Sequence, residues 1–525
     1  MPGSTLRATS SPSPDMPPVT LPTVPKWVRT SAIILFILAI GLRFYHIDEP
    51  AMEFMGMRQY RAALIARDIN YRTDPLCPSW KKAIASANAE KAIEPPISEY
   101  AAVMLYRLLG KEDIAYPRML ASCYWVVAGI FLFLLLLRFF APFVALFGSA
   151  FLLFLPGAYT ATRSFQPEPL MVMLTIICWY LLVRYDEQPT LSRLLAAALV
   201  GALAILVKVQ ALFFVYPFFL GLALARYPTY RTRVTALLKS PATYQFIGIT
   251  ILPVLVYYLS GLMHTKMLLG AAQTISTPQV IFTSMFWFSW LESLGRVMGY
   301  YPLVIAVLGI ILVTDTRLRL LQYCLWIGYL LYMLAFSYGA ATHQYYQLPF
   351  LPVAALSLCP LLQLTLPSLQ RHNTANVKPV VLVLFWVALS INIIFALDTL
   401  AHPEYVRTAE AMRELGETVN HSTRVISLTS DYGMSLKFYG ELCCQSWPIT
   451  ADFTRSQWMG DQVANAEDRF KGMLPQADYF AVTDPVEFSR QPELGKILTQ
   501  NYPVIKQTQD YILFDLRQRK QGKKP

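Results

Sequence analysis

Acidic and basic side chains gather in a polar stretch from His46 to Pro96, between the first hydrophobic segment and the next. A carboxylate near a membrane face can act as a general base that takes the proton from an attacking hydroxyl group. Arginine and lysine can hold the charge of a phosphate leaving group. Glu53 lies five residues before Arg58-Gln59, and helical spacing predicts a helix over Met57–Asp68. The alternative is a solvated helix face with incidental charges, which is common in proteins.

Glu94 is followed by Pro95 and Pro96. Two prolines restrict the backbone to an extended path, so the Glu94 carboxylate would be held rigidly at the membrane surface. The same dipeptide also serves as a simple helix breaker before a helix predicted over residues 97–110. The sequence favours neither explanation.

Charged residues also stand at the edges of hydrophobic segments. Arg163 and Glu168 enclose a short polar motif, and Lys208 separates two apolar runs. A charge at this depth is costly unless it faces a cavity or a partner. Lone lysines more often extend to the interface, but the short turn around Lys208 limits that escape, so an anion contact is the competing hypothesis.

His343 opens another apolar segment and precedes Tyr345 and Tyr346. The imidazole suits a metal ion, a phosphate or an interfacial position. The two tyrosines fit the aromatic belt of a membrane protein equally well.

The elements that position these residues are hydrophobic helices. The 525 residues are 55% hydrophobic and only 15% charged, with a mean hydropathy of +0.41. Several apolar runs are long enough to cross roughly 30 Å of hydrocarbon. The net charge of +11 is scattered over short loops, which argues against a nucleic-acid partner. The predicted spans are 27–45, 116–138, 141–160, 166–183, 191–208, 210–226, 243–262, 297–314, 318–338, 346–366 and 380–397.

Loops rich in Arg and Lys alternate with loops that are poor in them. The positive-inside rule then predicts a cytoplasmic N-terminus, with the polar stretch and everything after residue 397 outside. Counting residues 97–110 as a span would break this pattern, so they are predicted to form an interfacial helix. We expect a multi-pass protein of a bacterial plasma membrane.

Composition divides the chain into three parts. Residues 1–26 resemble a disordered cytoplasmic tail, because they are rich in Pro, Ser and Thr. Residues 27–398 form an all-α polytopic membrane domain, with residues 46–115 as its first outer loop and juxtamembrane helices. Residues 399–525 form a C-terminal extracytoplasmic α/β domain. Its predicted elements are a helix over Glu404–Val419 and strands over Arg424–Thr429, Ala477–Thr483 and Tyr511–Leu516.

Seven cysteines include three in polar segments: Cys77, Cys443 and Cys444. Their spacing matches no zinc motif. The spacing favours neither a disulfide between Cys77 and Cys443 or Cys444 nor an unpaired, packing role for these residues.

Taken in order, the motifs resemble the GT-C glycosyltransferases, in particular the superfamily of protein O-mannosyltransferases and aminoarabinose transferases. The resemblance covers nearly the whole chain. Many relatives have an Asp-Glu pair where this chain has Arg58-Gln59, and Asp48-Glu49 lies too far upstream to match. A branch with Asp five residues before Arg-Gln fits better, with Glu53 in place of that Asp. The motifs are Glu53, Arg58-Gln59, Ile65–Asp68, Glu94-Pro95-Pro96, Leu109-Gly110, Arg118, Arg163–Glu168, Leu206–Lys208 and His343–Pro349.

The resemblance implies a reaction and a role for each motif. Relatives move a sugar from a polyprenyl-phosphate carrier to an acceptor on the outer face of the membrane. Glu53 would be the catalytic base, with Glu94 beside it. A divalent metal is a candidate cofactor, with Glu94 and His343 as its two candidate ligands. The carrier phosphate would be bound by Arg58, Arg163 and Lys208. The cavity and acceptor site would include Gln59, Glu168, His343, Tyr345 and Tyr346.

We therefore expect an inverting glycosyltransferase whose partners are a polyprenyl-phosphate-linked sugar, membrane lipids, and a glycan, lipid or protein acceptor. A transporter or flippase of lipid-linked sugars is the first alternative, although no inverted repeats are evident. A non-catalytic receptor or scaffold is the second, but it leaves Glu53, Glu94 and Lys208 unexplained. Release of polyprenyl phosphate separates the enzyme from both.

Overall fold

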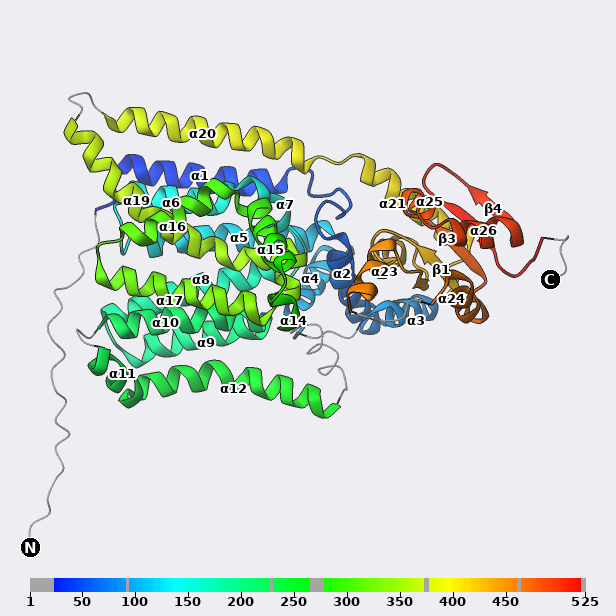
Figure 1. The fold of residues 1–525 in the computed structure, drawn as a ribbon, viewed down its shortest axis with the longest axis horizontal. Helices are drawn as coiled ribbons and strands as arrows, with labels where there is room; N and C mark the ends of the chain where they lie inside the picture. The colour runs from blue at the N-terminus through cyan, green and yellow to red at the C-terminus, as the bar shows by residue number, and fades with distance from the viewer. Residues whose placement is uncertain are drawn as a thin grey trace, which may run out of the picture.

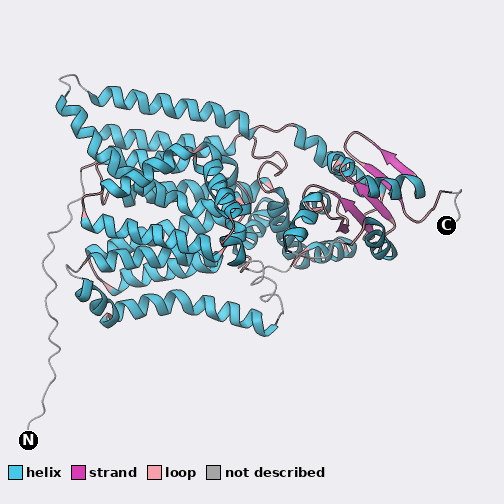
Figure 2. Cartoon of the chain, in the orientation of Figure 1, coloured by secondary structure: helices cyan, strands magenta, loops and turns pink. Residues whose placement is uncertain are grey.

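The computed structural model describes residues 23–90, 94–226, 230–264, 278–372, 377–459 and 464–520. Most of the predicted tail, residues 1–26, lies outside these ranges. A helical bundle occupies one end of the molecule and a smaller part that holds all the described strands occupies the other (Figures 1 and 2). This arrangement confirms the predicted fold class, an α-helical membrane part followed by an α/β part. The predicted domain boundaries stay a prediction.

The bundle is built from long apolar helices that pack side by side (Figure 1). The longer helices are α1 (Lys26–Phe44), α5 (Ala115–Leu136), α6 (Pro142–Phe154), α8 (Glu168–Glu187), α9 (Leu191–Val207), α10 (Leu212–Ala225), α12 (Pro241–His264), α15 (Ser284–Met298), α16 (Tyr300–Leu312), α17 (Thr316–Ala335), α19 (Leu351–His372) and α20 (Val377–Leu400). Short helical segments complete them: η1 (Pro156–Ala158), α7 (Tyr159–Thr162), η2 (Val209–Ala211), α11 (Tyr230–Lys239), α14 (Pro278–Ile281), α18 (Ser337–Thr342) and η3 (Gln344–Phe350).

Seven helices of the described chain are long and apolar enough to cross a membrane, and up to nine if each of two bent pairs counts as one span. Two shorter apolar helices, Leu191–Val207 and Val209–Ala225, account for the remaining predicted spans. The protein is therefore an integral, multi-pass membrane protein.

Two sharp bends interrupt the helices of the bundle. The predicted span over 141–160 bends by 51° after Phe154, because Pro156 has no N–H to continue the helical ladder. The predicted span over 297–314 corresponds to α16, and a bend of 97° at Gly299 separates it from α15, a helix that was not predicted. The φ of Gly299 is 81°, which is open to glycine but strained for other residues. Hydropathy alone gives no sign of either bend.

Three helices of the first loop connect the bundle to the C-terminal part: α2 (Gly56–Arg72), α3 (Ser79–Asn88) and α4 (Ile97–Leu109). In Figure 1, α2 and α4 lie between the two parts, and α3 runs alongside the C-terminal part. Helix α2 confirms the predicted helix over 57–68, and α4 ends where Gly110 adopts a left-handed conformation. Tyr60 of α2 is fully buried and donates a hydrogen bond to the Tyr439 hydroxyl at 3.0 Å. The first loop is thus packed against the C-terminal part.

The C-terminal part contains one sheet of five strands in the order β2-β1-β3-β5-β4. Pairs β1–β2 and β1–β3 are parallel, and β3–β5 and β4–β5 are antiparallel. The strands are β1 (Val425–Leu428), β2 (Cys444–Ser446), β3 (Tyr479–Val482), β4 (Val504–Gln507) and β5 (Ile512–Asp515). The helices are α21 (Glu404–Thr418), α22 (Met434–Tyr439), α23 (Thr450–Met459), α24 (Ala466–Met473), η4 (Leu474–Gln476), α25 (Pro485–Ser489) and α26 (Pro492–Asn501).

The predicted helix and the three predicted strands of this part are confirmed as α21, β1, β3 and β5. Strands β2 and β4 were not predicted. Both lie at the edges of the sheet, and their side chains are largely exposed or half-buried, so they lack the apolar pattern of a core strand. All seven cysteines are free thiols, so Cys77 is not paired with Cys443 or Cys444.

Candidate active site

Two basic side chains converge on one tyrosine where α2 and η3 meet the bundle. The Arg58 guanidinium carbon lies 4.8 Å from the centre of the Tyr345 ring. The Lys208 ammonium lies 5.0 Å from the same ring and 5.5 Å from the ring of Tyr346. Both cations are therefore within the distance of about 6 Å from a ring centre at which cation–π contacts form.

Breaks in two membrane helices position the charged groups. Helix α9 ends at Val207, and Lys208 has an extended backbone before the chain turns into η2. Helix α8 begins at Glu168 between Pro167 and Pro169, which are suited to a helix start because neither has an N–H that would be left without a helical partner. The two interruptions bring Lys208 and Glu168 into a buried ion pair, with 3% and 2% of the side chains exposed. The Glu168 Oε2 atom has no hydrogen-bond partner among the described residues.

Arg58 stays charged although the bundle and first loop enclose it. Burial alone would lower the pKa of its guanidinium, but Tyr345, Glu168 and Glu94 together raise the pKa above its usual value. Glu94 is half-buried and has no ion pair among the described residues. The structure thus brings Arg58, Glu94, Glu168, Lys208 and Tyr345 into one electrostatic cluster.

Glu53 belongs to a second, buried cluster. Its Oε1 atom accepts hydrogen bonds from Arg118 and, at 3.1 Å, from Arg163 Nε. The side chains of these three residues are at most 2% exposed. One carboxylate held between two guanidinium groups is a strong anchor for the surrounding chain.

The same two arginines fix the path of the first loop. Arg118 Nη1 donates to the carbonyl oxygens of Ile47 at 2.8 Å and Glu49 at 2.6 Å. Arg163 donates to the carbonyl oxygens of Tyr45 at 2.6 Å and Leu400 at 3.1 Å. Arg163 was predicted to bind phosphate, but its guanidinium contacts Glu53 and backbone oxygens in the described structure.

Gln59 and Gln166 are both buried but differ in their hydrogen bonding. Gln59, predicted to face the cavity, is fully buried: it donates to the Phe54 carbonyl at 2.8 Å and accepts from the Phe165 amide at 2.9 Å. Gln166 is only 4% exposed, and neither atom of its amide has a partner among the described residues. A buried amide without partners is a signal for a ligand that sequence spacing could not supply.

His343 lies beside the tyrosines. Its ring centre is 5.5 Å from that of Tyr345 and 6.2 Å from that of Tyr346, and its Nδ1 is 2.6 Å from Thr342 Oγ1. Within the described ranges, no three His, Cys, Asp or Glu side chains are grouped to hold a metal ion. Glu94 and His343 are two candidate ligands, fewer than the ligand number typical of zinc sites.

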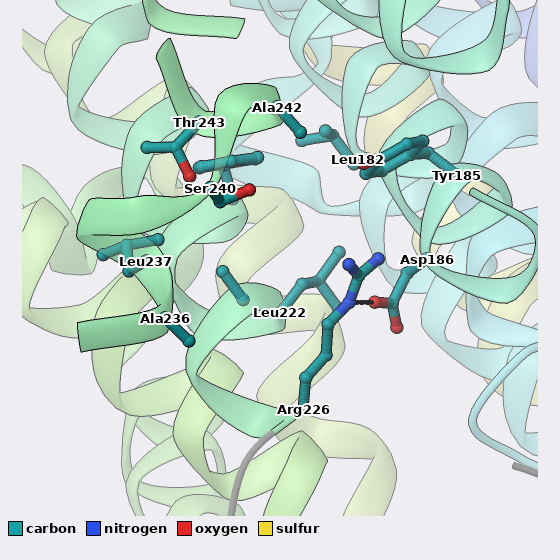
Figure 3. Close-up of a pocket in the computed structure, with 12 residues that line it drawn as sticks. Leu182, Tyr185, Asp186, Leu222, Arg226, Ala236, Leu237, Ser240, Ala242 and Thr243 are labelled. Carbon is teal, nitrogen blue, oxygen red and sulfur yellow. Dashed lines mark hydrogen bonds and ion pairs between the residues drawn. The ribbon is translucent and has the colours of Figure 1, made fainter. Parts of the chain in front are cut away.

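A small pocket lies at the far end of α8 (Figure 3). Arg226 and Asp186 form an ion pair at its edge, and Arg317 Nη2 donates to the other Asp186 oxygen at 2.5 Å. Asp186 is eighteen residues after Glu168 on one helix, about 27 Å along its axis. The pocket is therefore separate from the Arg58–Lys208 cluster, and its ion pairs tie α8 to α10 and α17.

Comparison with known proteins bears on both sequence and fold. Residues 93–258 match the family model of dolichyl-phosphate-mannose-protein mannosyltransferase. ArnT from Cupriavidus metallidurans, solved in the apo state and bound to undecaprenyl phosphate, superimposes with a TM-score of 0.58 and 15% identity, over 93% of this chain and 98% of that one. The chain therefore has the fold of the GT-C glycosyltransferases.

A more distant GT-C structure agrees. The archaeal oligosaccharyltransferase AglB from Archaeoglobus fulgidus, in complex with an inhibitory peptide and a dolichol-phosphate, has a TM-score of 0.55 and 11% identity, over 93% of this chain and 74% of that chain. No curated protein sequence matches the chain significantly. The family match includes Glu94, Glu168 and Lys208 but ends before Tyr345 and begins after Arg58, so the charged cluster extends outside the matched segment.

Proposed function

We propose that this GT-C protein transfers a sugar from a polyprenyl-phosphate donor to an acceptor hydroxyl on the outer face of the membrane, with inversion. One observation carries the proposal: Arg58 and Lys208 converge on Tyr345, within the electrostatic reach of Glu94 and Glu168. A site with two cations and nearby carboxylates suits the departure of a phosphate and the removal of a proton.

Arg58 and Lys208 would bind the carrier phosphate. Both are charged groups over the ring of Tyr345. A phosphate bound between them would share Lys208 with Glu168, whose Oε2 atom has no hydrogen-bond partner among the described residues. Because Arg163 already holds Glu53, we assign it to positioning the first loop instead.

Two carboxylates compete for the role of base. Glu53 was expected to take the acceptor proton, but its Oε1 is occupied by two guanidinium groups. Glu94 is half-buried, next to Arg58, and not ion-paired among the described residues. A base must reach the proton that it removes. We therefore favour Glu94 as the base and Glu53 as the residue that positions Arg118 and Arg163.

In this reaction the acceptor oxygen attacks the anomeric carbon while the bond from that carbon to the phosphate oxygen breaks. The Glu94 carboxylate receives the hydroxyl proton, and the lipid phosphate leaves with its charge held by Arg58 and Lys208. A single displacement from the opposite face inverts the anomeric centre.

The distribution of basic loops supports a cytoplasmic N-terminus and a site on the outer face. We infer the plasma membrane of a bacterium as the location. The lipid phosphates bound by ArnT and AglB support a lipid-linked donor in general. The sugar is open, and the acceptor is a glycan, a lipid or a protein.

The test uses purified full-length protein in lipid nanodiscs, with a panel of polyprenyl-phosphate hexoses and pentoses. We expect at least one donor to release polyprenyl phosphate, and Arg58→Gln to slow that release at least tenfold. Transbilayer movement of donors in vesicles without any release would identify a flippase and overturn the proposal.

A further inference from the structure

A polar cavity of about 490 Å³ lies between the first loop and the C-terminal part. One wall comes from the C-terminal end of α2 and residues 111–114, and the other from α21 and α22. Both helices α2 and α21 lie at the junction of the two parts in Figure 1. The volume is within the range of small-molecule sites. The charged residues that line it are Asp48, Arg67, Lys111, Glu112, Asp113, Arg413, Glu417 and Glu441.

Arg67 fixes one side of this cavity. Its Nε donates to Glu112 Oε1 at 2.7 Å, and its Nη1 donates to the Phe438 carbonyl at 2.6 Å. The guanidinium carbon also lies 4.0 Å from the centre of the Phe438 ring. One side chain thus joins three segments that are far apart in sequence, and the cavity wall is a preformed surface.

Other polar groups of the cavity remain available. The second oxygen of Glu112, Oε2, is buried and has no hydrogen-bond partner among the described residues. Arg413 lies over the Tyr439 ring, with 4.9 Å from guanidinium carbon to ring centre, and forms no ion pair within the described ranges. An unsatisfied buried polar atom is costly, so Glu112 Oε2 points to a ligand that pairs with it. Arg413 is exposed and lines the same cavity, where its guanidinium can donate to such a ligand.

The balance of charge limits the kind of ligand. Five carboxylates face three basic side chains around the cavity. This excess of negative charge disfavours a phosphate or another anion. Carboxylate acceptors and a guanidinium donor near Tyr71 and Tyr439 can instead pair with hydroxyl groups, and the tyrosine rings offer flat apolar surfaces.

We propose that this cavity binds an uncharged, hydroxyl-rich ligand: the glycan portion of the acceptor, at a distance from the reacting hydroxyl. The assignment as an acceptor subsite rests on the proposed function. Arg67 is nine residues after Arg58 on α2, about 14 Å along the axis, and Tyr71 about 20 Å. A ligand in the cavity is therefore too far from Arg58 for chemistry but close enough to belong to the same extended acceptor.

The direct test is binding, without any donor. Full-length protein in nanodiscs is titrated with mannotriose and N,N′,N″-triacetylchitotriose as uncharged probes and with spermidine as a cationic probe, by saturation-transfer NMR and calorimetry. We expect saturable binding of at least one oligosaccharide, weakened at least tenfold by Arg413→Gln and by Glu417→Gln. Glu410→Gln is the matched control, since Glu410 is exposed on the same helix and does not line the cavity.

Three outcomes overturn the proposal: no saturable oligosaccharide binding, binding that both cavity variants retain, or binding of spermidine alone. Thermal unfolding checks that the variants fold, which is expected because Arg413 and Glu417 are exposed on α21. Oligosaccharide binding together with no sugar transfer from any lipid-phosphate donor would leave the cavity site standing and refute the proposed function, so the two failures are distinguishable.

Discussion

The guanidinium of Arg58 lies 4.8 Å from the centre of the Tyr345 ring, so the start of α2 and the start of η3 meet at one charged contact. The negative groups around it keep the pKa of Arg58 above its usual value. Residues almost three hundred positions apart in sequence are thereby joined at the proposed phosphate site.

Replacing Arg58 with Gln should reduce sugar transfer by about 10- to 150-fold, because a hydrogen bond to a charged group contributes about 1.5–3 kcal/mol. Tyr345→Phe keeps the ring and should retain most activity. Arg61→Gln is the control: Arg61 is on the same helix and pairs with Glu90 at 2.5 Å. Initial rates of polyprenyl-phosphate release measure all three. Equal losses in Arg58→Gln and Arg61→Gln would contradict the assignment.

Lys208 and Glu168 should be coupled in stability. Removing one partner of a buried pair leaves an uncompensated charge and typically costs ~3–5 kcal/mol, whereas replacing both by apolar residues can be nearly neutral. We expect Lys208→Met to lower the unfolding temperature clearly and Lys208→Met/Glu168→Leu to recover most of it. Transfer activity should stay lost in both. A double variant no more stable than the single one would show that the two charges do not compensate each other.

Glu53→Gln and Glu94→Gln should fail in different ways. The first weakens the contacts of two buried arginines, so we expect a lower unfolding temperature along with lost activity. The second should leave the unfolding temperature within about 1 °C and slow turnover by ~10²–10⁴-fold, as loss of a general base does. Thermal unfolding and turnover are measured on the same preparations. Full activity in Glu94→Gln, with inactive but stable Glu53→Gln, would return the base to Glu53.

Glu99 provides a test of pH dependence. Burial, with the negative charge of Glu94, raises its pKa to about 7, although Arg61 and Arg58 act in the opposite sense. The unfolded chain releases this proton near the ordinary pKa of about 4.3. The folded state therefore holds more protons between these values, and its stability falls as pH rises through this window.

Glu99→Gln mimics the neutral form and should remove that loss. The variant should unfold at a higher temperature than the parent at pH 8, by on the order of 2 °C or more, and at the same temperature near pH 4.5. Unfolding is followed at both pH values in the same nanodiscs. An equal gain at both would mean that packing, rather than the charge of Glu99, sets the difference.

Much of the fold could be predicted from periodicity. The helix over 57–68 and the helix ending before Gly110 follow from local pattern and a glycine cap, and β1, β3 and β5 from short apolar runs. Edge strands β2 and β4 could not, because they bury too little apolar surface. Nor could the 97° bend at Gly299, because a single glycine in an apolar run also fits a straight helix.

Local sequence patterns also predict the position of some site residues. Lys208 and Glu168 each adjoin a helix break that the sequence marks, so their position near a membrane edge was foreseeable. The pairing of Glu53 with Arg118 and Arg163 was not, since it depends on tertiary contacts over 65 and 110 residues. Local spacing also cannot tell that Gln59 binds backbone while Gln166 remains unpaired.

Helix α20 has a consequence for how the membrane itself acts on this protein. Its 24 residues are about 36 Å long, whereas the hydrocarbon core of a bilayer is roughly 30 Å thick. Only 17% of its most apolar stretch is buried in the protein. We expect such a helix to adjust its tilt to bilayer thickness. The carbonyl oxygen of its last residue, Leu400, accepts a hydrogen bond from Arg163, which also donates to Glu53. We therefore expect hydrophobic mismatch at α20 to reach the first loop through this contact, so that the acyl-chain length of the host lipids changes the activity of the protein.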